Sequence, residues 1–315
     1  MTHKTAVSVG IRVPHELFNG VLAGLREGVA DIAASGIDRL VVGDHVTFHG
    51  GTGFDGLVQA TALAALSDLE VQTAVYLLPL RHPVAVARQL NSLCQIAPGR
   101  FLFGVGVGGE DPKEVLACGV DPTTRGRRTD EMLVIIRQLL AGESVTHQSS
   151  FFDLDDVRIL PPLRAPMPIV VGGRSEAALR RAGRYGDGYL ALWTTADRFV
   201  QSVATVEQYA ADAGRHGVDW RHGLQVWSGF DDSAAQARPA LAKAMEQLYR
   251  TPFEKFERWA PYGTPADVAV ALKPFVDAGC RDINIIPIAG SAAAAIAGVA
   301  EIRRALVAHA EGRPS

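Results

Sequence analysis

The chain has 315 residues, of which 48% are hydrophobic and 21% charged, with a formal net charge of -3. One α/β barrel of roughly 250 residues with insertions accounts for this length. Because charges of both signs nearly balance, the chain has no strong positive potential that would attract a polyphosphate backbone. This argues against nucleic acid as a partner. Three cysteines without CxxC spacing indicate neither a disulfide framework nor a zinc ribbon and favour the cytoplasm. We find no apolar run of the roughly 18 residues that a membrane span needs, and no apolar signal core at the N-terminus.

The first part of the chain alternates strand-like and helix-like segments. Short apolar runs predict strands at 6–11 and 37–43, and helix-spaced apolar residues predict helices after each of them. The stretch 71–110 repeats the pattern, with a strand at 71–78, a helix that starts near Pro83, and a strand at 101–103 that runs into glycines. This alternation favours a parallel sheet.

The alternation continues after an irregular segment at 111–127. An insertion at 144–166 contains two β-rich runs, and a loop excursion at 250–263 is rich in aromatic residues and proline. Capping signals predict helix starts at Ser175, at Thr194 to Asp197, and at Thr264 to Asp267. Eight strands are predicted in all, at Val7, Leu40, Val75, Leu102, Val170, Leu190, Val226 and Ile285.

Eight strand–helix units are the number that closes a TIM barrel. The sequence therefore predicts a parallel (β/α)8 TIM barrel as a single domain over 1–315, with insertions after strands 4 and 7. In such barrels the chemistry lies at the C-terminal ends of the strands. The segments expected at that rim are Asp44-His45, Tyr76 to Arg81, Gly106 to Glu110, Gly172 to Ser175, Trp193 and Trp227.

Two glycine-rich strand ends are open to a chemical and to a structural interpretation. Residues 104–109 match GxGxxG, but Glu110-Asp111-Pro112 interrupts the helix that a dinucleotide fingerprint must open. Small residues here also allow a tight bend with something lying close against it. Gly172 to Ser175 combine a helix N-terminus, a hydroxyl and a guanidinium, which suits an anion. An ordinary capped helix start looks the same.

Asp44-His45 at a strand end favours proton chemistry, with His45 holding or passing a proton and a neighbouring carboxylate orienting it. Together with His49 the pair forms D-H-x-x-x-H, but the sequence offers no convincing third metal ligand. Glu110 on the glycine loop is either solvated or serves as an acid or substrate contact. Trp193 and Trp227 either fill the barrel mouth or contact substrate.

Several motifs in order along the first 195 residues make the chain similar to the bacterial luciferase-like flavin-dependent oxidoreductases. These motifs are Val41-Val42-Gly43-Asp44-His45, the segment Leu80 to Gln89, Pro98 to Gly106, Gly119-Val120-Asp121, Arg125 to Glu131, Pro168 to Gly173 and Gly186-Asp187-Gly188.

The resemblance implies a barrel enzyme, commonly dimeric, that uses reduced FMN or the deazaflavin coenzyme F420. Members of the F420 branch carry a histidine and a carboxylate at the positions of His45 and Glu110, although Glu110 stands one residue later here. A non-prolyl cis peptide that backs the ring maps to Val75-Tyr76. The cofactor contacts implied for this chain are Asp44, Val75, Tyr76, Gly106, Gly108, Val170, Val171, Gly172, Gly173, Arg174 and Ser175.

We therefore expect a cytoplasmic oxidoreductase that acts on an unknown small organic substrate, by hydride transfer with F420 or by monooxygenation with reduced FMN. Two alternatives stay open: a catalytically inactive ligand-binding barrel, and a metal-dependent hydrolase. The loops 111–127 and 251–263 would select the substrate, but they contain no motif that identifies it.

Overall fold

The computed structural model describes residues 7–109 and 111–312. These residues form two compact units that alternate along the chain. The first unit contains residues 7–41, 189–208 and 219–312, and the second contains residues 42–188 and 209–218.

The strands of the first unit are parallel to one another. They are β1 (Ser8–Arg12), β2 (Arg39–Val42), β9 (Gly188–Leu192), β10 (Gly223–Phe230), the short β11 (Tyr262–Gly263) and β12 (Asp282–Ile288). Alternate residues point to opposite faces of a strand. On one face Val9, Ile11 and Ile285 are fully buried, whereas the other face carries Arg39 and Asn284.

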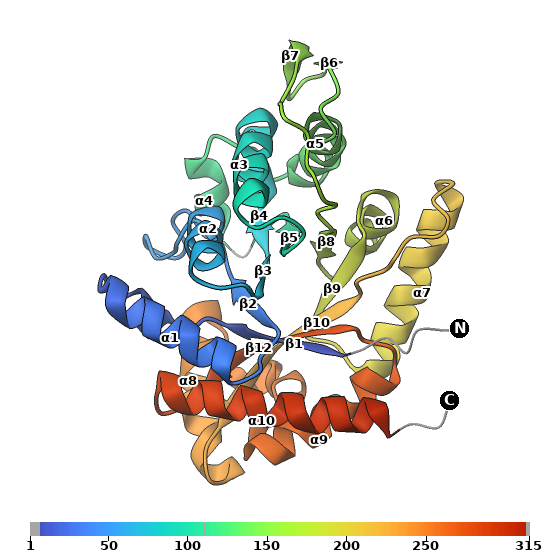
Figure 1. The fold of residues 1–315 in the computed structure, drawn as a ribbon. Helices are drawn as coiled ribbons and strands as arrows, with labels where there is room; N and C mark the ends of the chain where they lie inside the picture. Colours follow the sequence, from blue (N-terminus) through green and yellow to red (C-terminus); the bar gives the residue numbers. More distant parts are fainter. Residues whose placement is uncertain (1–6, 110, 313–315) are drawn as a thin grey trace. The chain divides into compact units, whose positions relative to one another are not determined.

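The helices of the first unit follow its strands along the chain. They are η1 (His15–Phe18), α1 (Leu22–Ala34), α7 (Ala196–Asp212), α8 (Ala234–Tyr249), η3 (Phe253–Lys255), η4 (Glu257–Trp259), α9 (Pro265–Asp277) and α10 (Ala292–Glu311). Helices α9 and α10 pack side by side (Figure 1). The predicted start of α9 is confirmed, because Thr264 and Asp267 form a capping box. The predicted start at Thr194 is wrong by one residue, since Thr195 accepts from the backbone N–H of Arg198.

A buried ion cluster crosses the polar face of this unit. Arg39 is fully buried and donates to Asp282 at 2.5 Å and to Asn284 at 3.1 Å, while Arg221 donates to both oxygens of Asp282. Burial alone would raise the pKa of Asp282, but Arg39 and Arg221 together lower it below its ordinary value. Removing one member would leave a buried charge uncompensated, so the cluster holds β2, β12 and the loop before β10 together.

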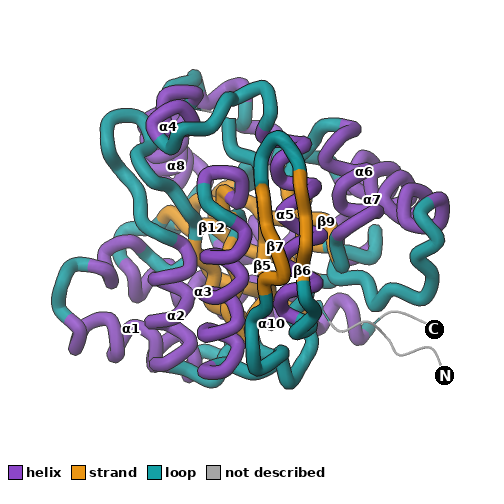
Figure 2. Tube along the Cα trace, turned by 90° about the horizontal axis from the view of Figure 1, so that it is seen from above, coloured by secondary structure: helices purple, strands orange, loops and turns teal. Residues whose placement is uncertain are grey.

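The second unit contains four parallel strands, one antiparallel pair and the helices that connect them. Its strands are β3 (Glu70–Thr73), β4 (Tyr76–Leu77), β5 (Phe101–Gly106), β6 (Val145–Gln148), β7 (Asp153–Val157) and β8 (Ile169–Gly172). Its helices are α2 (Gly56–Leu66), η2 (Leu78–Leu80), α3 (Pro83–Ile96), α4 (Pro112–Ala117), α5 (Arg125–Leu140) and α6 (Glu176–Tyr185). The pair β6–β7, seen in Figure 2, is the hairpin predicted within 144–166.

Two predicted segments of this unit differ from the structure. The third predicted strand, 71–78, is divided into β3 and β4 by Ala74 and Val75 and ends in η2. The segment 111–127 is not irregular throughout, because Asp111 caps the short helix α4.

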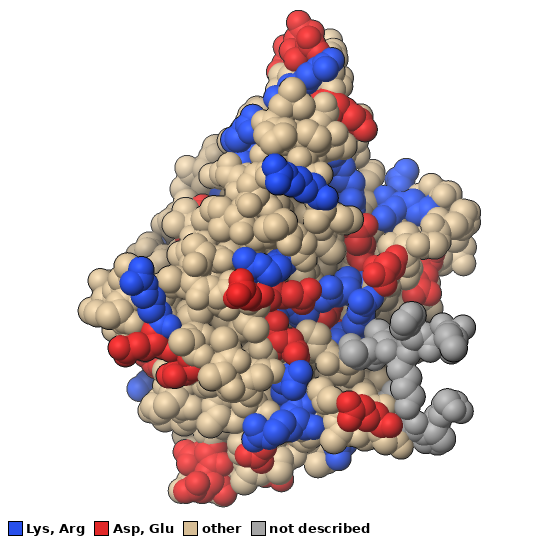
Figure 3. Space-filling model, viewed as in Figure 1, with Lys and Arg blue, Asp and Glu red and all other residues tan. Residues whose placement is uncertain are grey.

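The fold class is the parallel (β/α)8 barrel predicted from the sequence. Its eight strands are β1, β2, β3, β5, β8, β9, β10 and β12, while β4 and β11 are short additions. On the face seen in Figure 3, acidic and basic side chains are interspersed, in keeping with the small net charge. Within residues 7–109 and 111–312, we find no helix with the length and apolar character of a membrane span.

Candidate active site

Asp44 follows β2, and its carboxylate joins three segments of the second unit. Oδ1 accepts from the backbone N–H of Gly56 at 2.9 Å, and Oδ2 accepts from that of Leu77 at 2.8 Å. The Arg81 guanidinium donates to both oxygens, at 2.5 and 2.7 Å. Burial raises the pKa of Asp44, and Arg81 opposes that shift. Because both oxygens are engaged within the protein, we interpret Asp44 as a positioning residue, and its predicted cofactor contact stays a prediction.

His45 faces Glu114 of α4. Its Nδ1 lies 3.1 Å from Glu114 Oε2, while Glu114 Oε1 accepts from the backbone N–H groups of Val46 at 2.6 Å and Thr47 at 3.1 Å. A carboxylate oxygen accepts, so Nδ1 of His45 is the donor in this pair and carries a proton. Nε2 has no hydrogen-bond partner among the described residues, and the His45 side chain is 29% exposed. This nitrogen is therefore available to take or return a proton.

The loop that carries His45 is fastened to the start of α4. The rings of Phe48 and His45 stack at 4.0 Å between centroids. Asp111, the N-cap of α4, accepts from the backbone N–H of Lys113 and from that of His49 at 2.8 Å. The hydrogen bond from His49 lowers the pKa of Asp111. The short helix therefore holds both the His45 ring and the loop behind it.

Val75 lies between two glycines at the ends of β5 and β8. A Cβ added at Gly106 would lie 2.5 Å from Val75 Cγ2, and one added at Gly172 would lie 2.7 Å from Val75 Cγ1. Both positions therefore need glycine, because the branched side chain of Val75 approaches the two strand ends closely. The non-prolyl cis peptide joins Ala74 to Val75, one bond earlier than predicted. Val75 remains partly exposed and presents an apolar surface at this strand end.

Tyr76 is buried in the second unit, and Gly108 is partly exposed beside Leu77. The Tyr76 ring is fully buried, 5.6 Å from the ring of Phe103 and 4.4 Å from the guanidinium carbon of Arg81. Burial raises the pKa of the Tyr76 phenol, which therefore stays neutral. Gly108 has φ +66° and packs against Leu77. Only the backbone of these two residues is available to a ligand, so their predicted cofactor contacts would be backbone contacts.

The turn between β8 and α6 is a capped helix start. The Ser175 hydroxyl accepts from the backbone N–H of Ala178 at 3.3 Å. Gly173 has φ +142°, and a Cβ there would lie 2.6 Å from the Cβ of Ala178. Gly173 is thus required by the backbone and by packing, whether or not an anion binds at this turn.

The same turn is nevertheless accessible. Arg174 is exposed, and the first backbone N–H groups of a helix have no intrahelical acceptor. Glu176 adds a competing carboxylate, which accepts from the hydroxyl of Tyr209 at 2.5 Å. Val170 and Val171 are each 1% exposed, so their predicted contacts could come only from the backbone.

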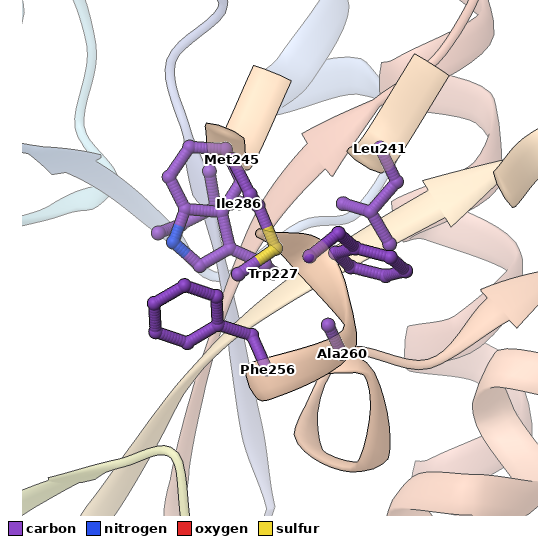
Figure 4. Packing of buried hydrophobic residues seen from close by; sticks show 7 residues of the cluster. Trp227, Leu241, Met245, Phe256, Ala260 and Ile286 are labelled. Atoms are coloured by element: carbon purple, nitrogen blue, oxygen red, sulfur yellow. The ribbon is translucent and has the colours of Figure 1, made fainter. Parts of the chain in front are cut away.

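Trp193 and Trp227 lie in the first unit, where Tyr249 and Phe256 connect them. Trp227 Nε1 donates to the Tyr249 hydroxyl at 3.0 Å. The Trp193 ring lies 4.9 Å from Tyr249 and 4.8 Å from Phe256. Figure 4 shows the Trp227 indole packed against Met245 in the core of this unit. Trp227 is 8% exposed and mainly fills the core, whereas Trp193 is partly exposed.

A cavity of 490 Å³ opens beside Trp193. Residues from the end of β9, from β10, from the segment 257–262 and from α9 line it, among them Gln225, Trp259 and Phe275. Its volume is in the range of small-molecule pockets, roughly 300–1,000 Å³.

Comparison with known proteins assigns the chain to a family. Residues 5–309 match the family described as luciferase-like monooxygenase. The chain belongs to this family. It is 35% identical over 243 residues to the 4-hydroxyprotoasukamycin monooxygenase of Streptomyces nodosus subsp. asukaensis, a match that covers 73% of this chain and 63% of that protein.

The names of two further similar proteins include coenzyme F420. The chain is 26% identical over 310 residues to the F420-dependent glucose-6-phosphate dehydrogenase of Kineococcus radiotolerans, with 88% and 90% of the two chains covered. An F420-dependent secondary alcohol dehydrogenase, solved with an F420–acetone adduct, has a TM-score of 0.82 at 18% identity, covering 96% of this chain and 99% of that chain. This structural likeness shows the fold.

The predicted family and fold class are thereby confirmed, and relatives in this family are named as F420-dependent oxidoreductases and monooxygenases. The chain spans 63% of the length of the monooxygenase to which it is 35% identical, and 54% of the length of a Mycobacterium bovis relative to which it is 34% identical. Its own substrate and activity are therefore matters for proposal.

Glu110, predicted as an acid or substrate contact, lies outside the described residues. Within those residues, no three histidine, cysteine, aspartate or glutamate side chains come together as a metal-ligand set. His49, the second histidine of D-H-x-x-x-H, instead lies 3.5 Å from Asp111 through its Nδ1.

Sequence reasoning missed Glu114 and Tyr249, and it missed the partner of Arg81. Arg81 was part of a recognised motif, so its position was marked but not its partner, Asp44. Glu114 stands at the third position of a helix that starts with Asp111-Pro112, which is a helix-start signal. That signal predicts α4 but not which loop its carboxylate contacts.

Proposed function

We propose that the protein is an oxidoreductase that uses coenzyme F420 to transfer hydride to or from a small organic substrate. The observation that carries this proposal is the pairing of His45 Nδ1 with the buried carboxylate of Glu114, which leaves Nε2 available. A fixed neutral imidazole suits a reaction that removes or supplies one proton for each hydride moved. The F420-dependent relatives support the choice of cofactor.

The residues of the second unit fit a ring-and-phosphate cofactor. Val75 offers a partly exposed apolar surface, and Gly106 and Gly172 keep the strand ends beside it free of side chains. The phosphate would be held at Gly173 to Ser175, where first-turn N–H groups and Arg174 favour an anion. The bound cofactor would supply the hydride acceptor or donor, and the protein would orient it and exclude water.

The roles of the chain's own residues follow from their contacts. Glu114 holds the ring of His45 and its tautomer, so that Nε2 can accept a proton from substrate or return one. Asp44, through Arg81 and Leu77, fixes the segment after Val75 and hence the surface proposed for the ring.

Reduced FMN with monooxygenation is the second candidate, favoured by the relative named as a monooxygenase. Parallel titrations with F420, FMN and reduced FMN discriminate between the two, with the absorbance of each cofactor as the readout. Preferential binding of F420, and loss of turnover but not of binding in His45→Gln, is the expected result. If no cofactor spectrum changes, the protein is the inactive ligand-binding barrel and the proposal fails.

The phosphate position is tested by Arg174→Gln with Arg180→Gln as the matched control. Both arginines are exposed, and Arg180 lies further along α6. We expect the affinity for the cofactor to fall by about tenfold in Arg174→Gln only. In that variant the affinity should also depend less steeply on salt concentration. Gly173 is unsuitable for this test, because any side chain there is strained at φ +142°.

We further propose a single luciferase-like domain that forms a homodimer in the cytoplasm. Helix α2 supports the dimer, because it is apolar on its exposed as well as its buried side, with Val58 67% exposed and Phe54 42% exposed just before it. Cys94, Cys118 and Cys280 are free, in keeping with a reducing compartment. Light scattering after chromatography should give a dimer for the parent protein and a monomer for Val58→Glu.

A further inference from the structure

Arg12 ends β1 on the polar face of the first unit. Its neighbours Ile11 and Val9 are fully buried on the opposite face. Gly10, two residues before Arg12, lies on the same face as Arg12, and a Cβ there would lie 2.6 Å from Asn284 and 3.2 Å from Arg39. Arg12 therefore lies one row beyond the buried ion cluster, toward the C-terminal ends of the strands.

Arg12 differs from Arg39 in its partners. Arg39 donates to Asp282, Asn284 and Ser8. Arg12 is partly buried, yet within residues 7–109 and 111–312 its guanidinium makes no hydrogen bond or ion pair. Burial lowers its pKa, and Tyr249 acts in the opposite direction. A guanidinium has five N–H donors, and those of Arg12 have no acceptor among the described residues, so a ligand can accept from them.

The strand register places an apolar wall beside this cation. Ile11 pairs with Ile285, and Ile286 pairs with Trp227, so Arg12, Ile286 and Trp227 occupy one row across β1, β12 and β10. At the usual strand spacing, the two ends of this row are roughly 10 Å apart. The Tyr249 hydroxyl accepts a hydrogen bond from Trp227, and its ring contacts the ring of Trp193. Tyr249 is also the side chain whose electrostatic interaction with Arg12 raises the pKa of that guanidinium.

We propose that Arg12 binds the anionic oxygens of the organic substrate, and that the Trp193–Tyr249 pair contacts its apolar body. The substrate class is thus a small organic acid, either a carboxylate or a phosphate monoester, since both present two oxygens to the guanidinium fork. This assignment rests on the proposed oxidoreductase function and names the substrate class for it.

Binding of simple probes to the full chain tests the assignment without turnover. Benzoate and phenyl phosphate supply the two anions, and benzamide is the neutral control of similar shape. Calorimetry gives the affinities, and tryptophan fluorescence reports occupancy near Trp193. Arg12→Gln removes the charge, Arg12→Lys keeps the charge without the fork, and Arg304→Gln removes an exposed charge from α10 of the same unit.

At least one anion should bind the parent protein more tightly than benzamide does. Arg12→Gln should lower the affinity for that anion by about 10- to 100-fold. Arg304→Gln should leave the anion affinity unchanged. The anion affinity of Arg12→Lys should lie between that of the parent and that of Arg12→Gln. Preference for benzoate or for phenyl phosphate decides between the two acids. Anion binding that is absent in the parent, or equal in parent and Arg12→Gln, overturns the assignment.

Two further measurements separate this assignment from misfolding and from failure of the proposed function. Arg12→Gln should unfold at the parent temperature or above it, because it removes a cation without a partner. A lower unfolding temperature would show that Arg12 is structural and would overturn the assignment. Cofactor titrations of the same variant should match the parent. If the parent binds no cofactor but still binds the anion through Arg12, the proposed function fails and the anion site stands.

Discussion

Replacing Glu114 by glutamine tests whether this carboxylate sets the state of His45. The carboxamide oxygen can still accept from the N–H groups of Val46 and Thr47, but an NH2 donor then faces Nδ1. The neutral imidazole must accept at Nδ1 and carry its proton on Nε2. We expect nitrogen NMR at pH 8 to show this change of tautomer, and turnover to fall by about 10²- to 10⁴-fold.

The stability effect of Glu114 can be worked from the same contacts. Glu114 is 3% exposed and accepts from two backbone N–H groups and one imidazole. Hydrogen bonds to a charged group contribute about 1.5–3 kcal/mol each, but Val46 is 46% exposed and water can replace part of the loss. Glu114→Ala should therefore lower the free energy of unfolding by about 2–4 kcal/mol, and Glu114→Gln by about 1 kcal/mol.

Urea unfolding measures both variants, and hydrogen exchange of the Val46 and Thr47 amides locates the effect. Glu301→Ala is the control, because Glu301 is exposed on α10, and its effect should stay within about 0.5 kcal/mol. The reasoning is refuted if Glu114→Gln keeps the Nδ1–H tautomer and full turnover. It is also refuted if Glu114→Ala changes stability no more than the control does.

Three shorter predictions concern the scaffold. Arg39→Met should lower the free energy of unfolding in urea by about 3–5 kcal/mol, because it leaves Asp282 with Arg221 alone. Since the folded pKa of Asp282 is lowered, its contribution is complete above its unfolded pKa of about 4 and should be lost as the pH falls below that value, so urea midpoints at pH 7, 4 and 3 should decline. Gly106→Ala should cost about 1–3 kcal/mol through its clash with Val75, and adding Val75→Ala should recover part of that loss in a double-mutant cycle.

The elements that the sequence predicted well are those whose signals are local. The start of α9 was predictable because Thr264, Pro265 and Asp267 carry the whole capping signal within four residues. Helix α2 is framed in the same way by Asp55, whose carboxylate accepts from the first-turn N–H groups. The glycines at strand ends were equally visible, although what lies against them was not. Val75 comes from a segment about 30 residues before Gly106 and 97 before Gly172, a distance over which a local pattern carries no information.

The site itself shows why partners are harder to predict than positions. Asp44 and His45 are adjacent, which made Asp44 the natural candidate to orient the imidazole. Successive side chains at a strand end point to opposite sides, however, so neighbours in sequence are poorly placed to contact each other. Asp44 instead contacts Arg81, and Glu114, 69 residues away, orients His45. A single sequence marks a carboxylate but does not show the direction of its side chain.

The difference between engaged and unengaged polar groups guides where chemistry should be sought. Asp44 and Arg39 have their hydrogen-bonding capacity taken up by the protein, so replacing either should affect folding first and activity only through it. His45 Nε2 and the Arg12 guanidinium have no protein partner among the described residues, although each lies at the C-terminal end of a strand. Leaving such groups unpaired is unfavourable for stability, and a fold retains them at sites where a ligand provides the missing partner. Arg12 variants should therefore lose binding while keeping their stability, the reverse of what Asp44 and Arg39 should show. His45→Gln should lose turnover, and its stability should change only by what its Nδ1 contact with Glu114 contributed.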